Sequence, residues 1–119
     1  MANIRFTYLY RDGSNYKNWA AAVFSNPDGL TCEALKKKFA KAFLTDGLFI
    51  ADQVRIPEVF LWNAQSIDSD DHCFHEFDAI ENTNDPPDDQ HGRSIREFAD
   101  EVAANASQGW KAFEPSDIA

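Results

Sequence analysis

Hydrophobic and polar residues alternate over the first part of the chain. Residues 4–10 place their larger apolar side chains at every second position, namely Ile4, Phe6, Tyr8 and Tyr10. A period of two is typical of a strand with one buried face. Residues 12–15 supply turn chemistry, and residues 16–24 can return beside the first segment. The pattern therefore predicts an N-terminal β-hairpin.

Two later segments carry the helical period instead. In the first, Thr31 is a candidate N-cap, Gly47 is the expected stop, and the apolar positions are Leu35, Phe39, Ala42 and Phe43. In the second, Ser94 and Glu97 match a capping box and Gly109 ends a helix predicted at about 95–107. Its apolar stripe consists of Ile95, Phe98, Ala99, Val102, Ala103 and Ala106.

The remaining segments are less regular. Residues 48–62 predict two short extended pieces separated by Pro57, because proline removes a ladder donor. Residues 73–81 alternate again and predict a strand with Cys73, His75, Phe77 and Ala79 on one side, and 82–92 is a loop by composition. The order predicts a single α+β domain over residues 1–119, with a small, mainly antiparallel sheet and two helices packed on one face.

Size and composition agree with one globular domain. The chain has 119 residues, of which 44% are hydrophobic, enough for a core. No apolar stretch reaches the roughly 18 residues of a membrane span, and the N-terminus lacks a signal-peptide pattern. Cys32 and Cys73 are too few for a disulfide framework, so we expect both to be reduced. These features predict a cytoplasmic protein without a membrane partner.

Charge is distributed unevenly along the chain. Residues 1–67 have a net charge of +2 and residues 68–119 a net charge of −11, which together give −9. An acidic half of this kind favours a cationic partner, such as a basic protein surface, and argues against direct binding of nucleic acid.

The densest group of chemically active side chains lies at 68–78, with Asp68, Asp70, Asp71, His72, Cys73, His75, Glu76 and Asp78. Histidine with carboxylates could hold a divalent metal, but a strand would point His72 and His75 to opposite faces. The alternatives are a solvated turn with surface acids, or a recognition groove whose histidines change charge near neutral pH. A nucleophilic Cys73 beside His75 lacks an orienting third group.

A second group surrounds the hairpin turn at 11–19. Asp12, Gly13 and Asn15 can simply form the turn while Tyr16 and Trp19 join the core. Alternatively, Arg11, Tyr16, Lys17 and Trp19 offer the donors and flat apolar surface that recur at protein interfaces. The chain has no glycine-rich phosphate-binding motif, so nucleotide binding has no support.

Three segments resemble a group of small bacterial proteins of unassigned function. They are the R-D-x-x-N-Y-K pattern at 11–17, the F-I-x-x-Q-V-x-x-P pattern at 49–57 and the D-H-x-x-H-E pattern at 71–76. The resemblance covers roughly residues 8–78. It implies a compact bacterial domain and assigns no catalytic residue.

These observations lead to two hypotheses. The first is a small acidic protein-binding module without cofactor or catalytic residues; its specific form is a phage or mobile-element inhibitor, anti-CRISPR-like, that occupies a basic nucleic-acid-binding surface. The expected binding residues are Asp68, Asp70, Asp71, His72, His75, Glu76, Asp78, Asp85, Asp88, Asp89, Arg11, Tyr16 and Trp19. The alternative is a metal-dependent enzyme with a histidine–carboxylate site in residues 71–78.

Overall fold

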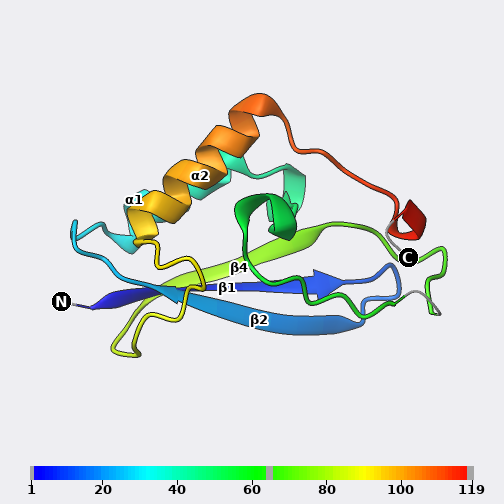
Figure 1. Ribbon diagram of the computed structural model, residues 1–119, viewed down its shortest axis with the longest axis horizontal. Coiled ribbons are helices and arrows are strands. Elements are labelled where there is room, and N and C mark those ends of the chain that lie inside the picture. Colours follow the sequence, from blue (N-terminus) through cyan, green and yellow to red (C-terminus); the bar gives the residue numbers. More distant parts are fainter. Residues whose placement is uncertain (1, 64–65, 118–119) are drawn as a thin grey trace.

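The fold comes from a computed structural model that describes residues 2–63 and 66–117. Its elements are β1 (Asn3–Arg11), β2 (Lys17–Phe24), α1 (Cys32–Ala42), β3 (Leu48–Phe49), β4 (His75–Thr83) and α2 (Ile95–Gln108). The four strands form one sheet in the order β2-β1-β4-β3, and every neighbouring pair is antiparallel. Both helices lie on one face of this sheet (Figure 1), which confirms the α+β prediction. No helix of the described part is long and apolar enough to cross a membrane.

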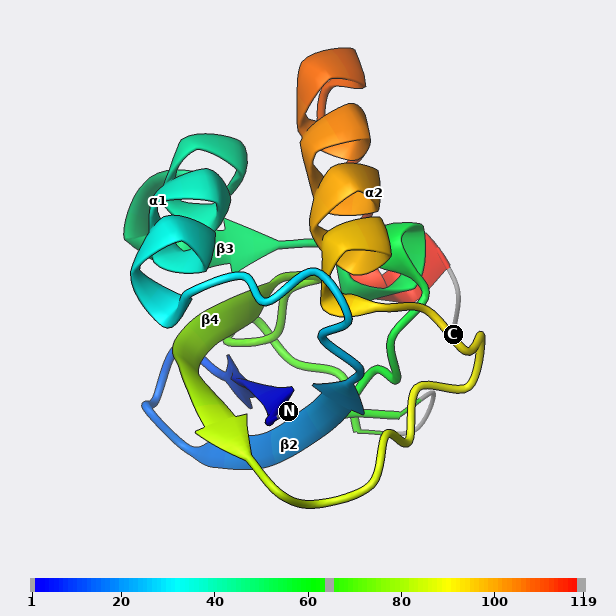
Figure 2. The same ribbon diagram turned by 90° about the vertical axis from the view of Figure 1, so that its left-hand side faces the viewer.

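The core lies between the curled sheet and the two helices (Figure 2). Strand β1 is central, and Ile4, Phe6, Tyr8 and Tyr10 are fully buried on its inner face, as their alternation predicts. The hairpin register pairs Phe6 with Ala22 of β2, so small residues on the edge strand face large aromatic ones on the central strand. In the described part of the chain, the outer face of the sheet has no helix over it.

Strand β4 contains a bulge that changes its phase. Ala79 lies opposite Thr7 and Phe77 opposite Tyr8, which leaves Asp78 as an extra residue. A bulge shifts every later side chain to the other face of the sheet. Ile80 is therefore buried opposite Phe6, and the prediction that Ala79 shares a face with His75 is wrong.

Helix α1 ends earlier than the glycine signal indicates. Thr31 accepts the backbone N–H of Ala34 at 3.1 Å and begins the helix as predicted, but Phe43 leaves it in an extended conformation. The Phe43 ring then stacks on Phe39 at a centroid distance of 5.4 Å. Gly47, with a φ of 75°, lies in a later 3₁₀ turn, so its prediction as the helix stop is wrong.

Residues 48–62 form less strand than their sequence predicts. Only Leu48 and Phe49 pair with β4, and a 3₁₀ turn follows at Ala51–Val54. Residues 57–62 form no described strand and run beside the sheet as an irregular strap. The Tyr8 hydroxyl donates to the Pro57 carbonyl at 2.6 Å and the Asn18 amide donates to the Val59 carbonyl at 3.1 Å. Polar side chains of β1 and β2 thus hold the second of the two extended segments that the sequence predicts, and it forms no described strand.

Helix α2 has the predicted capping box. Ser94 accepts the Glu97 N–H at 3.2 Å, and the Glu97 carboxylate accepts the Ser94 N–H at 2.9 Å. After the helix, the Trp110 indole donates to the Ala42 carbonyl at 2.9 Å, so the chain after α2 folds back on the core. The buried stripe ends at Val102, however, since Ala103 and Ala106 are only half-buried.

Replacing Ser94 with alanine should lower the free energy of unfolding by about 1 kcal/mol, because one N-terminal amide of α2 loses its partner. A urea titration measures this change. The control is Ser107→Ala, which removes an exposed hydroxyl near the other end of α2 and should stay within about 0.5 kcal/mol of the parent. An unchanged midpoint for Ser94→Ala would contradict the role of this cap.

Candidate functional site

The two groups of candidate residues meet at one end of the sheet. The backbone N–H of Gly13 donates to the Asp70 carbonyl at 2.9 Å, and the Ser14 hydroxyl donates to the Asp70 carboxylate. The Tyr10 hydroxyl donates to Asp71 at 2.9 Å. A Cβ on Gly13 would lie 3.0 Å from an Asp70 carboxylate oxygen, so a larger residue at this position would require Asp70 to shift by a few tenths of an ångström. The loop at 66–72 is therefore fixed to the hairpin turn (Figure 1).

The hairpin turn is held by its own side chains. One Asp12 carboxylate oxygen accepts the N–H groups of Ser14 and Tyr16, both at 2.9 Å, and Asn15 takes a left-handed conformation with a φ of 69°. Tyr16 is 71% exposed and Trp19 is 51% exposed. The interpretation of these two aromatic residues as core is therefore wrong, because Tyr16 at the end of the turn and Trp19 on β2 are both exposed to solvent.

We call this region the hairpin-end surface and define it by Tyr16 and Trp19 together with the carboxylates of Asp12, Asp68 and Asp70. The Asp68 carboxylate accepts the Asp70 N–H at 2.8 Å, which orders the acidic loop. A cavity of about 230 Å³ lies beside this surface and is lined in part by Arg11, Asp12 and Glu76. It is smaller than the roughly 300–1,000 Å³ of a typical small-molecule site. The geometry therefore favours docking of a surface over enclosure of a ligand.

His72 uses both of its ring nitrogens within the chain. Nε2 lies 2.7 Å from the Arg11 carbonyl, to which it donates, and Nδ1 accepts the Phe74 N–H at 3.0 Å. This pair of contacts assigns the proton to Nε2. Neither nitrogen has a lone pair left for a metal in this arrangement.

His75 is almost completely buried. Its exposed fraction is 1%, and its ring lies among Tyr8, Tyr10, Phe49 and Phe60. Nε2 accepts the Val59 N–H at 2.9 Å, so the proton of the neutral ring is on Nδ1, which has no hydrogen-bond partner among residues 2–63 and 66–117. Burial, with a smaller effect of His72, lowers the pKa of His75 to about 4. His75 thus holds the strap at Val59 as a neutral acceptor and does not line the hairpin-end surface.

This depressed pKa predicts a pH-dependent stability. The pKa of His75 is about 4 in the folded chain against 6.5 ordinarily, so its contribution is complete above about pH 6.5 and is lost as the pH falls toward 4. At about 1.4 kcal/mol per pKa unit, roughly 2 kcal/mol should be lost between pH 7 and pH 5. Urea titrations at both pH values test this. His75→Gln should remove most of the difference, whereas His91→Gln, at an exposed position, should retain it; equal differences in all three proteins would contradict the assignment.

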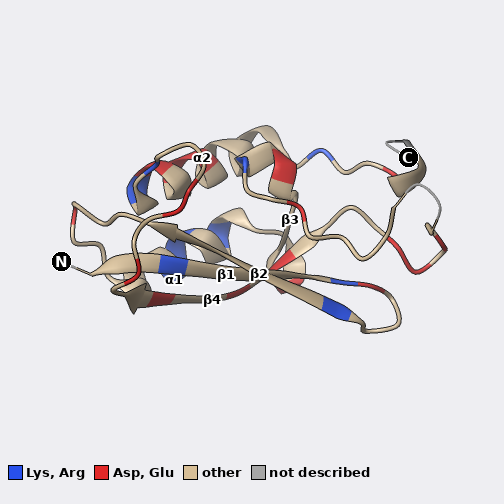
Figure 3. Ribbon diagram, turned by 60° about the horizontal axis from the view of Figure 1, so that its bottom comes forward, with Lys and Arg blue, Asp and Glu red and all other residues tan. Residues whose placement is uncertain are grey.

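Most acidic side chains of the C-terminal half contact groups of the same chain. The pairs are Asp70 with Ser14, Asp71 with Tyr10, Glu76 with Arg11, Glu81 and Asp85 with Arg5, Asp88 with Val23, Asp89 with Arg93, Asp100 with Lys38, and Glu101 with Arg55. Figure 3 shows acidic and basic segments interspersed over much of the ribbon. The charge that the sequence assigns to one half is therefore partly compensated inside the fold.

Several expected binding residues have structural contacts. Asp88 pairs with the edge of β2, where its carboxylate accepts the Val23 N–H at 2.7 Å and its N–H donates to the Val23 carbonyl at 3.0 Å. Glu76 accepts two hydrogen bonds from Arg11, at 3.1 and 3.2 Å. Asp78 is exposed at the bulge. Glu76 is paired with Arg11, and Asp88 and Asp78 lie beside Val23 and at the β4 bulge, away from the hairpin turn, so these three residues are not part of the hairpin-end surface.

Arg93 is the buried charge that sequence reasoning missed. Its side chain is 5% exposed and that of Asp89 is 3% exposed, and two guanidinium nitrogens donate to the Asp89 carboxylate at 2.8 and 3.0 Å. Arg93 also donates to the carbonyls of Val54 and Arg55, at 2.7 and 3.0 Å. Burial alone would raise the pKa of Asp89, but the hydrogen bonds and charge of Arg93 hold it below its usual value. This network joins the 84–92 loop, the 3₁₀ turn and the start of α2.

The enzymatic alternatives find little geometric support. Cys73 is 2% exposed, and burial raises the pKa of its thiol, which disfavours the thiolate that a nucleophile needs. Within residues 2–63 and 66–117, no three His, Cys, Asp or Glu side chains lie together as a metal site would require. The histidine–carboxylate segment of 71–78 is thus distributed between the core, the hairpin and solvent.

Comparisons with known proteins give no identification: no protein-family model, no curated protein and no solved structure matches this chain. The resemblance of the three short segments to a bacterial group stays a prediction.

Proposed function

We propose that the protein is a small protein-binding module that docks its hairpin-end surface on a basic surface of another protein. The observation that carries the proposal is the exposure of Tyr16 at the hairpin turn and of Trp19 near the start of β2, next to a turn that is bonded to the acidic 66–72 loop. Tyr and Trp are enriched among the residues that dominate binding energy at interfaces. Two exposed aromatic side chains and several carboxylates at the same end of the sheet fit a partner with an apolar pocket bordered by Lys or Arg.

The rigidity of this end supports the same proposal. Binding costs less conformational entropy when the contacting loop is already ordered. Asp12 fixes the turn from inside and Asp70 fixes it from the neighbouring loop, so the aromatic side chains start from a defined backbone. The carboxylates add long-range attraction toward a basic partner and raise the rate of encounter.

The most specific form of the proposal is an inhibitor of a nucleic-acid-binding complex from a defence system. A net charge of −9 repels nucleic acid but suits the Lys and Arg rows that bind phosphates. In this form, carboxylates of the 66–72 loop take the place of phosphates. Excess duplex DNA or RNA should then compete with the protein for its partner. If the protein bound a different surface of the partner, nucleic acid would not displace it.

Affinity capture followed by mass spectrometry tests the proposal. The parent protein and the Tyr16→Ala/Trp19→Ala variant are used as baits in the same bacterial lysate. We expect a basic protein that the parent captures and the variant loses, with a decrease in affinity of about 30-fold or more, which is the loss of at least one interface hot spot of about 2 kcal/mol. A control bait, Leu44→Ala, changes another exposed apolar residue and should retain the partner. Equal capture by all three baits would contradict the proposal.

A further inference from the structure

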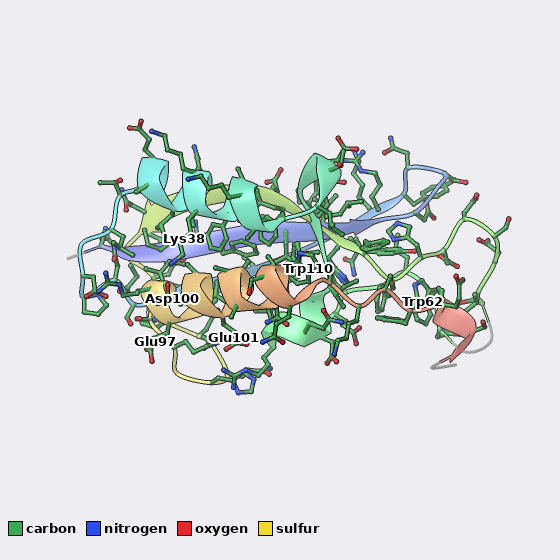
Figure 4. The ribbon with its side chains drawn as sticks, turned by 90° about the horizontal axis from the view of Figure 1, so that it is seen from above. Lys38, Trp62, Glu97, Asp100, Glu101 and Trp110 are labelled. Atoms are coloured by element: carbon green, nitrogen blue, oxygen red, sulfur yellow. The ribbon has the colours of Figure 1, made fainter. Side chains whose placement is uncertain are left out.

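A groove of about 520 Å³ lies between α1 and α2, away from the hairpin-end surface. Its floor includes Ala42, Ala103 and Ala106, and Lys37, Lys38 and Lys41 of α1 line it on one side. Figure 4 looks down between the helices, with Lys38 and Asp100 facing each other across the groove and Trp110 near its other end. The Trp110 indole is bonded to the Ala42 carbonyl, which fixes that end.

The apolar stripe of α2 extends further than the core that covers it. Ile95, Phe98, Ala99 and Val102 are buried, whereas Ala103 and Ala106 are half-buried and face the groove. A helix stripe of apolar residues is normally covered by another element. Small side chains on such a stripe let another helix approach to an interaxial distance of about 8 Å. The groove therefore has the shape and the floor of a helix-docking site.

Three lysines give one side of this groove a positive charge. Lys38 is paired with Asp100 across the groove. Lys37 has only an exposed contact of 3.7 Å with Glu33, and Lys41 forms no ion pair with any described residue. Lys37 and Lys41 lie one helical turn apart on the same face of α1, so two ammonium groups line the groove in a row.

We propose that this groove binds an amphipathic helix of another protein that carries Asp or Glu along one flank. The alanine floor receives the apolar stripe of the incoming helix, and Lys37 and Lys41 pair with carboxylates spaced four residues apart. Charge complementarity selects an acidic occupant over a basic one. The site is separate from the hairpin-end surface, so either proposal can fail without the other.

The test uses two synthetic helical peptides of about 18 residues, long enough to form a helix on a surface. They share one stripe of Leu and Ala; the first carries Glu along its flank and the second carries Lys at the same positions. Each is titrated into isotope-labelled protein while the amide resonances of Ala42 and Ala106 and the indole resonance of Trp110 are followed. We expect saturable shifts at these positions with the Glu peptide and none with the Lys peptide.

Matched variants of the protein complete the test. Lys37→Glu/Lys41→Glu should weaken binding of the Glu peptide by about tenfold or more, because paired charges turn repulsive. Lys17→Glu/Lys36→Glu changes the net charge equally at positions that do not line the groove and should change the affinity by less than about threefold. No binding of the Glu peptide at millimolar concentration, equal binding of both peptides, or equal effects of the two variants would overturn the proposal. Self-association of the protein through α1 and α2 would overturn it as well.

Discussion

Replacing Phe98 with alanine is expected to lower the free energy of unfolding by about 3–5 kcal/mol, the usual cost of truncating a buried aromatic side chain. Phe98 is fully buried on α2. Its ring stacks on Phe24 at 4.5 Å and contacts Phe6 edge-on at 5.1 Å, so it joins the helix to two strands. The lost stability therefore has two parts, the transfer free energy of the buried ring and the cost of the cavity that its removal leaves.

A guanidinium chloride titration measures this effect. The control is Arg96→Ala, which changes an exposed residue of the same helix and should stay within about 0.5 kcal/mol of the parent. A loss below about 1 kcal/mol for Phe98→Ala would mean that the α2 stripe does not hold the core together.

Replacing Asp89 with alanine should cost about 3 kcal/mol, because it leaves the Arg93 guanidinium buried without its main counter-charge. Glu101, 3.2 Å from Arg93, compensates part of the loss and keeps it near the lower end of the usual 3–5 kcal/mol range. The matched control is Asp85→Ala, which breaks an exposed ion pair with Arg5 and should cost no more than about 1 kcal/mol. Similar losses in both variants would contradict the buried-pair interpretation.

The same pair predicts acid sensitivity. Because the pKa of Asp89 is lowered in the folded chain, its contribution is present above the ordinary value of 3.8 and is lost as the pH falls through the lower folded value. Urea titrations give the free energy of unfolding at about pH 7 and pH 3. The difference between these two values should be larger for the parent than for Asp89→Ala.

Elements with a clear period could be predicted from the sequence, whereas contacts between distant loops could not. The alternation at 4–10 identifies β1, and the Ser94 capping box identifies the start of α2. Both signals are formed by residues close together in the sequence. The bulge at Asp78 gives no local signal, yet it reverses the face of Ile80. It arises from the pairing of β4 with β1, which the order of residues does not encode locally.

The candidate site follows the same division. The residue types at 11–19 and 68–76 indicate two groups that can bind a partner. The sequence does not indicate that Gly13 lies against Asp70 and so joins the two groups. The sequence predicts that Asp88 and Asp89 bind a partner. In the fold, the Asp88 carboxylate instead accepts the Val23 N–H, and Asp89 forms an ion pair with Arg93. Arg93 lies four residues after Asp89 in an irregular loop, where no periodic pattern marks a buried ion pair.

The structure also determines which carboxylates can be changed without unfolding the protein. Asp12→Asn, Asp68→Asn and Asp70→Asn each retain an amide oxygen that can accept the hydrogen bonds of the turn and loop. Combined, they remove three negative charges from the hairpin-end surface. The matched control, Asp28→Asn/Glu33→Gln/Asp52→Asn, removes three negative charges from exposed positions outside this surface.

The most direct measurement of the binding proposal is a titration of these two triple variants and the parent against the captured partner, at low and at physiological NaCl. Salt shortens the Debye length to about 8 Å at physiological ionic strength, so a carboxylate-guided interaction weakens as NaCl rises. We predict that affinity falls with salt for the parent and the control, and that the Asp12/Asp68/Asp70 variant binds at least about tenfold more weakly at low salt. Salt-independent binding that is equal in all three proteins would contradict an acidic hairpin-end surface.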